Sequence, residues 1–359
     1  MIPLMIDADA DADAPFVARL ASDPPDGSLL TARRVTGDSR SAIYSGDAGL
    51  FELALPMDGN IAGDVLLVHP QRRRAERLLR HGSAHNTLLV TERCDQLCVM
   101  CSQPPKKTHE DRFALLTEAC LLADPGQVIG ITGGEPTLFK AQLLGMIETV
   151  LTARPDLRFH VLSNGQHFAA TDIDRLRSPL YQRVEWGIPL YAAAAALHDR
   201  IVAKEGAFAR LEDSLAHLLM AGANIELRTV VLSHNVDVLP NLARHVAARL
   251  GFIGVWSIMQ LENIGFARNR WQELYHDHRH QFDPIAAALD IATLHGIGSR
   301  LFNFPLCTVP PAYRQFATAS ISDWKRRFGE ACDACSAKAD CSGFFEWHPA
   351  ANLMEVIPL

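Results

Sequence analysis

The sequence lacks an excess of positive charge, a long apolar run and a basic N-terminal segment. Its 34 lysines and arginines are outnumbered by 41 aspartates and glutamates, which gives a formal net charge of −7. Such a chain has no overall field that would hold nucleic acid non-specifically, so nucleic acid is an unfavoured partner. No apolar run approaches the ~20 residues of a membrane span, and the first residues lack the features of a secretory signal. We therefore expect a cytoplasmic protein with no membrane partner.

Cysteine is unevenly distributed along the chain. Eight cysteines in a reducing compartment favour metal binding or catalysis over disulfides. Cys94, Cys98 and Cys101 form one group, while Cys332, Cys335 and Cys341 form another with Cys307 upstream. Cys120 stands alone, and we expect it to be a core thiol.

The N-terminal part predicts a tail and a small module. Residues 1–26 carry aspartates alternating with alanines, which are poor strand formers, and we interpret this segment as a mobile acidic tail. Residues 27–80 contain short strand-like runs and form a small accessory module. Its basic end, residues 71–80, predicts a helix with a solvated face, and contact with an acidic partner is the alternative.

From residue 86 the chain alternates apolar strands with amphipathic helices through six units, which predicts an α/β fold with parallel strands. The alternation alone allows an open doubly wound sheet or an incomplete (β/α) barrel. It ends near residue 300, so we expect a domain over residues 81–300 and a separate cysteine-bearing module over residues 301–359. In either fold, function is expected at the carboxyl ends of the strands.

The first chemical motif follows the first of these strands. Cys94, Cys98 and Cys101 have the spacing C-x3-C-x2-C, and three thiolates on one loop can hold three irons of a [4Fe–4S] cube. The fourth iron is then open to a substrate group. The alternative is a zinc knuckle, for which a fourth local ligand is expected; the nearest candidate, His109, lies at an odd offset.

Two further motifs follow the next two strands. Gly133, Gly134, Glu135 and Pro136 form a turn in which glycines allow a ligand to approach the backbone and a carboxylate suits an ammonium group. Ser163 and Asn164 end the third strand, where a hydroxyl and an amide can bind ribose or carboxylate oxygens. A simple Asn–Gly turn is the alternative for the second of these motifs.

With these motifs, the chain resembles radical S-adenosylmethionine (SAM) enzymes over residues 85–300. The resemblance implies a partial (β/α)6 barrel in which Cys94, Cys98 and Cys101 hold a [4Fe–4S] cluster that chelates SAM. It also implies that Gly133, Gly134, Glu135 and Pro136 bind the SAM amino group, and that Ser163 and Asn164 lie near its ribose and carboxylate. Met100 occupies a position that is usually aromatic and adjacent to the adenine, and Arg228 is a candidate for the SAM carboxylate. An external electron donor of flavodoxin or ferredoxin type is implied as a partner.

The second cysteine group offers four ligands: Cys307, Cys332, Cys335 and Cys341. Four thiolates can hold zinc or an iron–sulfur cluster. The segment resembles the shortened auxiliary-cluster module, called twitch and related to SPASM, of radical SAM enzymes that modify peptides. This resemblance implies an auxiliary [4Fe–4S] or [2Fe–2S] cluster.

More narrowly, the chain resembles the HxsC-type radical SAM maturases of the His-Xaa-Ser system, through residues 88–90, 101–106, 305–307 and 320–324. The implied partners are a small His-Xaa-Ser repeat protein as substrate and companion maturation proteins. The alternatives are a radical SAM enzyme acting on RNA or a small metabolite, and a zinc-stapled binding protein.

Histidines outside these motifs favour structural roles. We expect His276, His278 and His280 on a solvated helix face, and a metal cluster is the alternative. We expect His198 with Asp199 to be a helix-capping pair, and a resemblance of residues 197–199 to peptide-modifying radical SAM enzymes is the alternative.

Overall fold

The computed structural model describes residues 3–21, 31–55, 60–349 and 357–359. The chain divides into two compact units: Met1–Thr91 with Glu110–Thr132 and Phe139–His160, and Glu92–His109 with Gly133–Leu138 and Val161–Leu359. Every residue of the predicted cysteine and SAM sites lies in the second unit. Among the described residues, no helix combines the length and the apolar character that crossing a bilayer requires.

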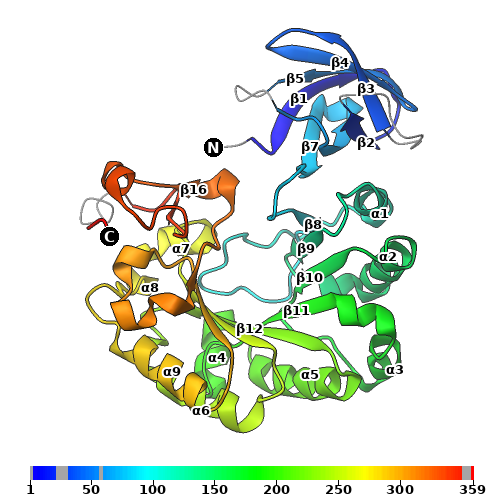
Figure 1. Ribbon diagram of the computed structural model, residues 1–359. Coiled ribbons are helices and arrows are strands. Elements are labelled where there is room, and N and C mark those ends of the chain that lie inside the picture. Colours follow the sequence, from blue (N-terminus) through cyan, green and yellow to red (C-terminus); the bar gives the residue numbers. More distant parts are fainter. Residues whose placement is uncertain (1–2, 22–30, 56–59, 350–356) are drawn as a thin grey trace. The chain divides into compact units, whose positions relative to one another are not determined.

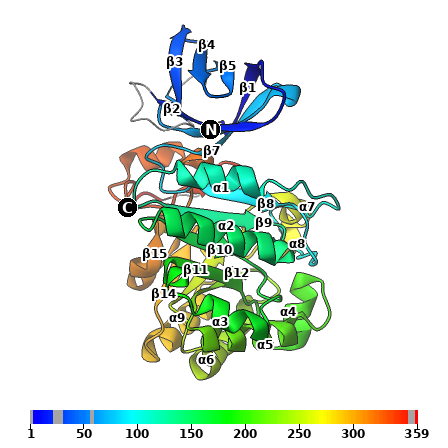
Figure 2. The same ribbon diagram turned by 90° about the vertical axis from the view of Figure 1, so that its right-hand side faces the viewer.

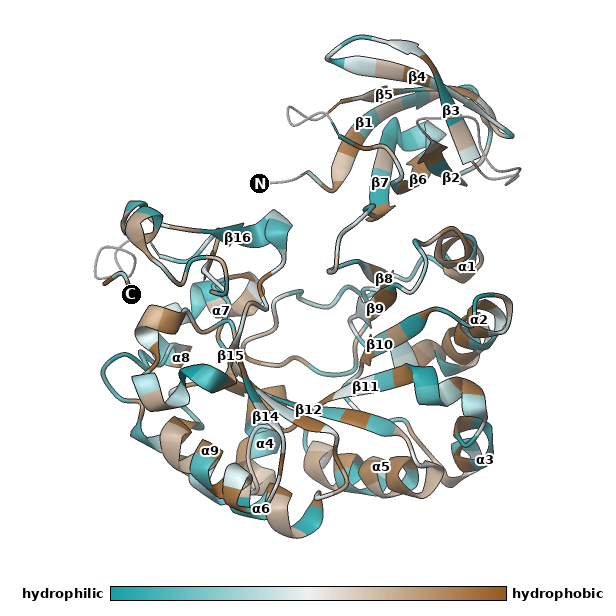
Figure 3. Cartoon of the chain, in the orientation of Figure 1, coloured by the Kyte–Doolittle hydropathy of each residue, from teal (hydrophilic) through white to brown (hydrophobic). Residues whose placement is uncertain are grey.

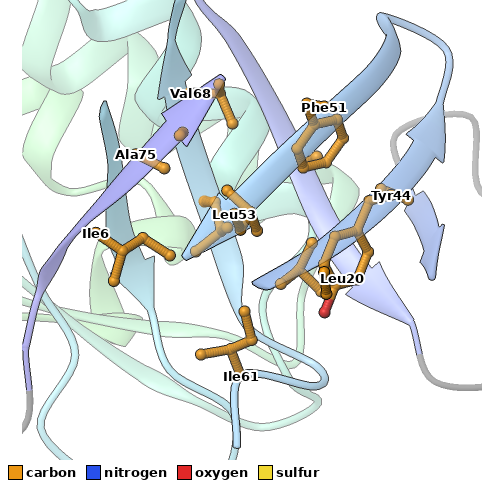
Figure 4. Close-up of a cluster of buried hydrophobic side chains, with 13 residues drawn as sticks. Ile6, Leu20, Tyr44, Phe51, Leu53, Ile61, Val68 and Ala75 are labelled. Carbon is orange, nitrogen blue, oxygen red and sulfur yellow. The ribbon is translucent and has the colours of Figure 1, made fainter. Parts of the chain in front are cut away.

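Seven strands at the start of the chain close into a barrel (Figure 1). Their order around the barrel is β1-β5-β4-β3-β2-β6-β7, and β7 pairs with β1. The interior is filled by apolar side chains that include Ile6, Leu20, Phe51 and Leu53 (Figure 4). The strands are β1 (Met5–Ala10), β2 (Phe16–Ala21), β3 (Thr31–Gly37), β4 (Ser41–Gly46), β5 (Gly49–Ala54), β6 (Val65–His69) and β7 (Arg74–Leu79).

The prediction of a mobile tail over residues 1–26 is wrong for its described part, because β1 and β2 are strands of this barrel. Ile6 and Ala8 are buried in β1, whereas Asp7 and Asp9, which alternate with them, are exposed. Ala8 pairs with Leu53 and Ala10 with Phe51, so each small side chain lies opposite a large one. Pairing with strands on both sides outweighs the low strand propensity of alanine and aspartate.

The predicted helix at residues 71–80 is also wrong. The segment contains a short 3₁₀ turn at Pro70–Arg72 and then β7. Arg77 is buried rather than solvated, and its Nε lies 2.7 Å from Asp64 Oδ2. The buried ion pair makes an inward arginine tolerable in a strand, a pairing that the local sequence does not reveal.

The predicted α/β fold is confirmed, with a sheet of eight strands. The order is β15-β14-β13-β12-β11-β10-β9-β8, and the pairs from β11 to β15 are parallel. Neighbours in the sheet are therefore neighbours in sequence, whereas a doubly wound sheet reverses its order at a switch point. The strands are β8 (Thr87–Thr91), β9 (Val128–Gly133), β10 (Arg158–Leu162), β11 (Val184–Pro189), β12 (Asn224–Val231), β13 (Val255–Gln260), β14 (Ser299–Phe302) and β15 (Ala317–Thr318).

Helices of the second unit cover one face of its strands, as Figures 1 and 2 show for α5, α6 and α9. In β12 the side chains of Ile225, Leu227 and Val231 are buried on one face, while the buried Glu226 and the half-buried Arg228 lie on the other face. Figure 3 shows hydrophobic and hydrophilic residues alternating along α5, as expected for a helix with one buried side. The helices of the chain are α1 (Phe113–Leu121), α2 (Lys140–Ala153), α3 (Ile173–Leu176), α4 (Ala195–Val202), α5 (Ala207–Ala221), α6 (Leu239–Arg249), α7 (Gly265–Asn269), α8 (Trp271–Leu274) and α9 (Asp283–Leu294).

The strand pattern continues past residue 300, contrary to the expectation that it stops there. β14 and β15 extend the sheet, so among the described residues it has eight strands, whereas the sequence predicts six. The sequence pattern does not reveal these strands, because they span only four and two residues. The remaining C-terminal residues form short 3₁₀ turns and the antiparallel pair β16 (Arg326–Arg327) and β17 (Phe344–Phe345).

Candidate active site

The three-cysteine loop follows β8 and is attached to the end of α4. Leu97 N donates to Val202 O at 3.2 Å, and Val99 N donates to Ile201 O at 2.9 Å. Within the loop, Cys101 N donates to Cys98 O at 3.0 Å, which closes a turn between two of the cysteines. These backbone hydrogen bonds hold the loop in a defined shape.

Two glycines pack directly against this loop. Glu135 N donates to Arg93 O at 2.7 Å, and a Cβ on Gly134 would lie 2.1 Å from the same oxygen. A Cβ on Gly265, whose φ is +60°, would lie 2.3 Å from Cys101 O. Only glycine permits approaches this close. The Gly-Gly-Glu-Pro turn and the segment after β13 therefore hold the two ends of the cysteine motif.

Glu135 is fully buried and accepts hydrogen bonds from the chain at both carboxylate oxygens. Oε1 accepts from Thr137 N at 2.9 Å, from Ser163 Oγ at 2.8 Å and from the Thr137 hydroxyl. Oε2 accepts from Asn164 N at 2.5 Å. Burial raises the pKa of Glu135, and these donors oppose the shift. The carboxylate thereby ties the turn after β9 to the end of β10.

Asp95, between the first two cysteines, extends this network. Its Oδ1 accepts from Asn164 Nδ2 at 2.8 Å, and its Oδ2 lies 3.1 Å from His167 Nε2 and also pairs with Lys204 Nζ. Burial opposes its ionisation, but the His167 and Lys204 hydrogen bonds lower the pKa of Asp95 well below its ordinary value. Asp95, His167 and Lys204 are absent from the residues predicted from sequence. The structure brings together the predicted Cys94, Glu135, Ser163 and Asn164.

The three thiols influence one another and fit a polynuclear metal group. Burial raises the pKa of Cys94 to about 11, and the charges of Glu135 and Asp95 add to the shift. Burial also raises the pKa of Cys98, with further contributions from Cys101 and Cys94. Neighbouring thiols that resist ionisation alone are ionised when a cation binds them, and binding releases their protons. Three sulfur donors on one loop are the donor set for an iron–sulfur cluster with one open iron.

Met100 and Arg228 occupy different surroundings. Met100 is buried in an apolar cluster that includes Tyr191, Ile201 and Leu261 and is packed against Cys98. Arg228 Nη1 lies 2.6 Å from Glu226 Oε2, so it forms an ion pair with its own strand. Neither contact assigns these residues to SAM.

The four C-terminal cysteines lie around a single cavity. Cys307, Cys332, Cys335 and Cys341 all line it, together with residues that include Pro305, Phe328 and Phe344. Burial raises the pKa of Cys307 to about 11, and the other three thiols contribute to the shift. Backbone N–H groups of Leu306 and Gly343 approach Cys341 Sγ at 3.3 and 3.4 Å, and Leu359 N lies 3.4 Å from Cys335 Sγ. Four thiols around one cavity, with N–H donors beside two of the sulfurs, offer the donor set of an iron–sulfur cluster or of zinc.

The remaining predicted residues have structural roles. Cys120 is fully buried, which confirms a core thiol. Asp199 caps the start of α5 by accepting from Gly206 N at 2.6 Å and Phe208 N at 2.7 Å, while His198 is buried.

The solvated helix face predicted for His276, His278 and His280 is wrong. The three residues lie between α8 and α9, and His278 is buried. Its ring nitrogens lie 3.3 Å from Gln260 Nε2 and 2.7 Å from Thr308 Oγ1. These polar partners come from distant segments and make the burial possible.

No protein-family model matches this sequence, and no curated protein does. Among solved structures, Streptococcus suis SuiB bound to S-adenosylmethionine is similar at 12% identity and a TM-score of 0.49 over 60% of this chain and 49% of SuiB. A radical SAM methyltransferase from Sphaerobacter thermophilus is similar at 15% identity and a TM-score of 0.45 over 76% of this chain and 77% of that one. Native anSMEcpe with bound AdoMet and Cp18Cys peptide is similar at 14% identity and a TM-score of 0.43, over 60% of this chain and 62% of that one. This chain spans about half the length of SuiB, and the matches assign it to none of these proteins.

Proposed function

We propose that this chain is a radical SAM enzyme that modifies a peptide or protein. The observation that carries the proposal is the cysteine loop itself. Cys94, Cys98 and Cys101 lie on a loop whose backbone contacts the Gly133–Glu135 turn, and whose Asp95 is hydrogen-bonded to Asn164. Three motifs that follow three successive strands thus meet in one network, as expected at the carboxyl ends of parallel strands.

In this proposal Cys94, Cys98 and Cys101 hold a [4Fe–4S] cluster, and Gly133, Gly134, Glu135 and Pro136 form the turn that binds the SAM amino group. When bound, the cluster and SAM supply radical chemistry that removes hydrogen from an unactivated carbon, with the electron delivered by a flavodoxin or ferredoxin. Met100 and Arg228 are the proposed adenine and carboxylate contacts.

The polar residues around the loop have positioning roles. Ser163 and Asn164 hold the Glu135 carboxylate, and Asn164 also holds Asp95. Lys204 balances the negative charge of Asp95 beside the thiolates. Interactions that are formed before the ligand arrives reduce the ordering needed on binding.

The wider assignments belong to the same proposal. In this proposal the eight-stranded sheet from β8 to β15 and its helices are the partial (β/α) barrel of such enzymes, and the seven-stranded N-terminal barrel is an accessory module. The described residues that follow β15, together with Cys307, form the twitch-like module, in which Cys307, Cys332, Cys335 and Cys341 hold an auxiliary [4Fe–4S] or [2Fe–2S] cluster. The proposed substrate is a small His-Xaa-Ser repeat protein. The proposed location is the cytoplasm, where thiols stay reduced.

Iron analysis of the anaerobically purified protein tests the proposal. Two four-iron clusters correspond to about eight iron atoms per chain. Cys98→Ala and Cys335→Ala should each lose one cluster, and Cys120→Ala serves as the matched control because this buried thiol belongs to neither group. A colourless protein that holds zinc and no iron would overturn the proposal in favour of a zinc-stapled binding protein.

A further inference from the structure

Gln96 lies between the first two cysteines and is buried, with 3% of its surface exposed. Its Oε1 accepts a hydrogen bond from the Cys98 thiol at 3.4 Å. Its Nε2 is also buried and has no hydrogen-bond partner within the described parts of the chain. A buried amide group without a partner is uncommon, because its lost hydration is not replaced.

The present orientation of the Gln96 amide suits a Cys98 thiol but not a Cys98 sulfur that is bound to metal. A thiol carries a hydrogen and donates it to an oxygen, which is the arrangement seen here. A metal-bound cysteine has lost that proton, and its sulfur accepts hydrogen bonds only. The carbonyl end of Gln96 then faces a negative sulfur, while the amide donor stays unpaired. Rotating the amide by half a turn resolves both conflicts, because Nε2 then takes the place of Oε1 beside the sulfur.

We propose that Gln96 donates an Nε2–H hydrogen bond to the Cys98 sulfur when the cysteine loop holds its cluster, and that this bond raises the reduction potential of the cluster. The inference rests on the proposed function. A donor beside a cluster sulfur stabilises the reduced state, which carries more negative charge. Gln96 is a positioning residue in this role and contacts a ligand of the metal rather than the substrate.

The other two sulfurs have different contacts. Cys94 Sγ accepts from the backbone N–H of Gln96 at 3.4 Å. Cys101 Sγ donates to the backbone carbonyl of Gln103 at 3.0 Å, and a backbone carbonyl cannot exchange places with a donor by a side-chain rotation. Among these three contacts, Cys98 has the one side-chain partner that can change from acceptor to donor.

The test is the midpoint potential of the cluster in the full-length, iron-loaded protein, titrated anaerobically and followed by EPR. The relevant signal is the one that Cys98→Ala removes. Gln96→Met keeps the approximate size and removes the donor, and Gln96→Glu replaces the donor with a negative acceptor. Gln127→Met is the matched control, because Gln127 is a half-buried glutamine of the other unit that donates to Ser83 O.

We expect the midpoint to become more negative in Gln96→Met, to become more negative still in Gln96→Glu, and to stay at the parent value in Gln127→Met. Parent midpoints in both Gln96 variants would overturn the inference. A second measurement uses the parent protein and needs no substitution. When the glutamine side-chain amides, including that of Gln96, are labelled with ¹⁵N, pulsed EPR should detect a ¹⁵N nucleus coupled to the reduced cluster. Absence of that coupling would overturn the inference even if the variants took up no iron. A parent protein without iron would instead show that the proposed function has failed.

Discussion

The substitution Glu135→Gln is expected to destabilise the protein strongly although it changes little in size. Both carboxylate oxygens accept from a backbone N–H that cannot turn away, Thr137 N at Oε1 and Asn164 N at Oε2. A glutamine amide has one oxygen, so in either orientation its NH₂ group faces one of these donors. One hydrogen bond to the carboxylate is lost, and one buried N–H is left without an acceptor.

Leaving a buried donor unpaired costs ~1–3 kcal/mol, and hydrogen bonds to charged groups contribute ~1.5–3 kcal/mol each. We therefore expect Glu135→Gln to lower the free energy of unfolding by about 3 kcal/mol. Ser163→Ala removes a single donor to the same carboxylate and should cost about 1 kcal/mol. Urea unfolding followed by circular dichroism measures both values. A Glu135→Gln protein within about 0.5 kcal/mol of the parent would contradict the role of Glu135 as a buried acceptor of two backbone N–H groups, because that difference is the scatter of ordinary surface substitutions.

Three further substitutions test other contacts in the second unit. Gly134→Ala places a Cβ 2.1 Å from Arg93 O, so the loop must shift, and we expect less than half of the parent's iron at the first site; parent-level iron would contradict the packing argument. Lys204→Met leaves Asp95 without its ammonium partner. Because 25% of the Lys204 side chain and 24% of the Asp95 side chain are exposed, we expect the free energy of unfolding in urea to fall by about 1 kcal/mol. An unchanged free energy of unfolding would show that this ion pair does not stabilise the fold. Burial lowers the pKa of His278 from 6.5 to about 3. The stability contributed by the neutral, buried imidazole is therefore complete above pH 6.5. It is lost as the pH falls below that value, at about 1.4 kcal/mol per pH unit. His278→Asn should flatten the fall in unfolding free energy between pH 6.5 and 5, and an unchanged slope would contradict a buried neutral imidazole.

The central part of the fold could be predicted from sequence because its periodicity is strong. The periodicity predicts a helix over residues 208–221, where the structure has α5, and a strand over residues 225–232, where it has β12. The N-terminal barrel could not be predicted in the same way. β1 consists of residues with low strand propensity, and it forms because β5 and β7 pair with it on both sides.

In the candidate site, too, some residues follow from a local sequence pattern and others are brought together only by the fold. Cys94, Glu135 and Asn164 could be placed together because each follows a strand, and parallel strands end on one side of the sheet. The ion pair between Asp95 and Lys204 joins residues 109 positions apart and leaves no local pattern. The amide of Gln96 is significant only through its burial and its missing partner, which a sequence does not display.

Reductive cleavage of SAM at the three-cysteine site, which we propose for this chain, is tested by measuring the 5′-deoxyadenosine that the iron-loaded protein forms with SAM and dithionite. We predict that the parent and Cys120→Ala proteins form 5′-deoxyadenosine and that Cys98→Ala does not. An iron-loaded parent that forms none, or a Cys98→Ala protein that forms as much as the parent, would contradict the account.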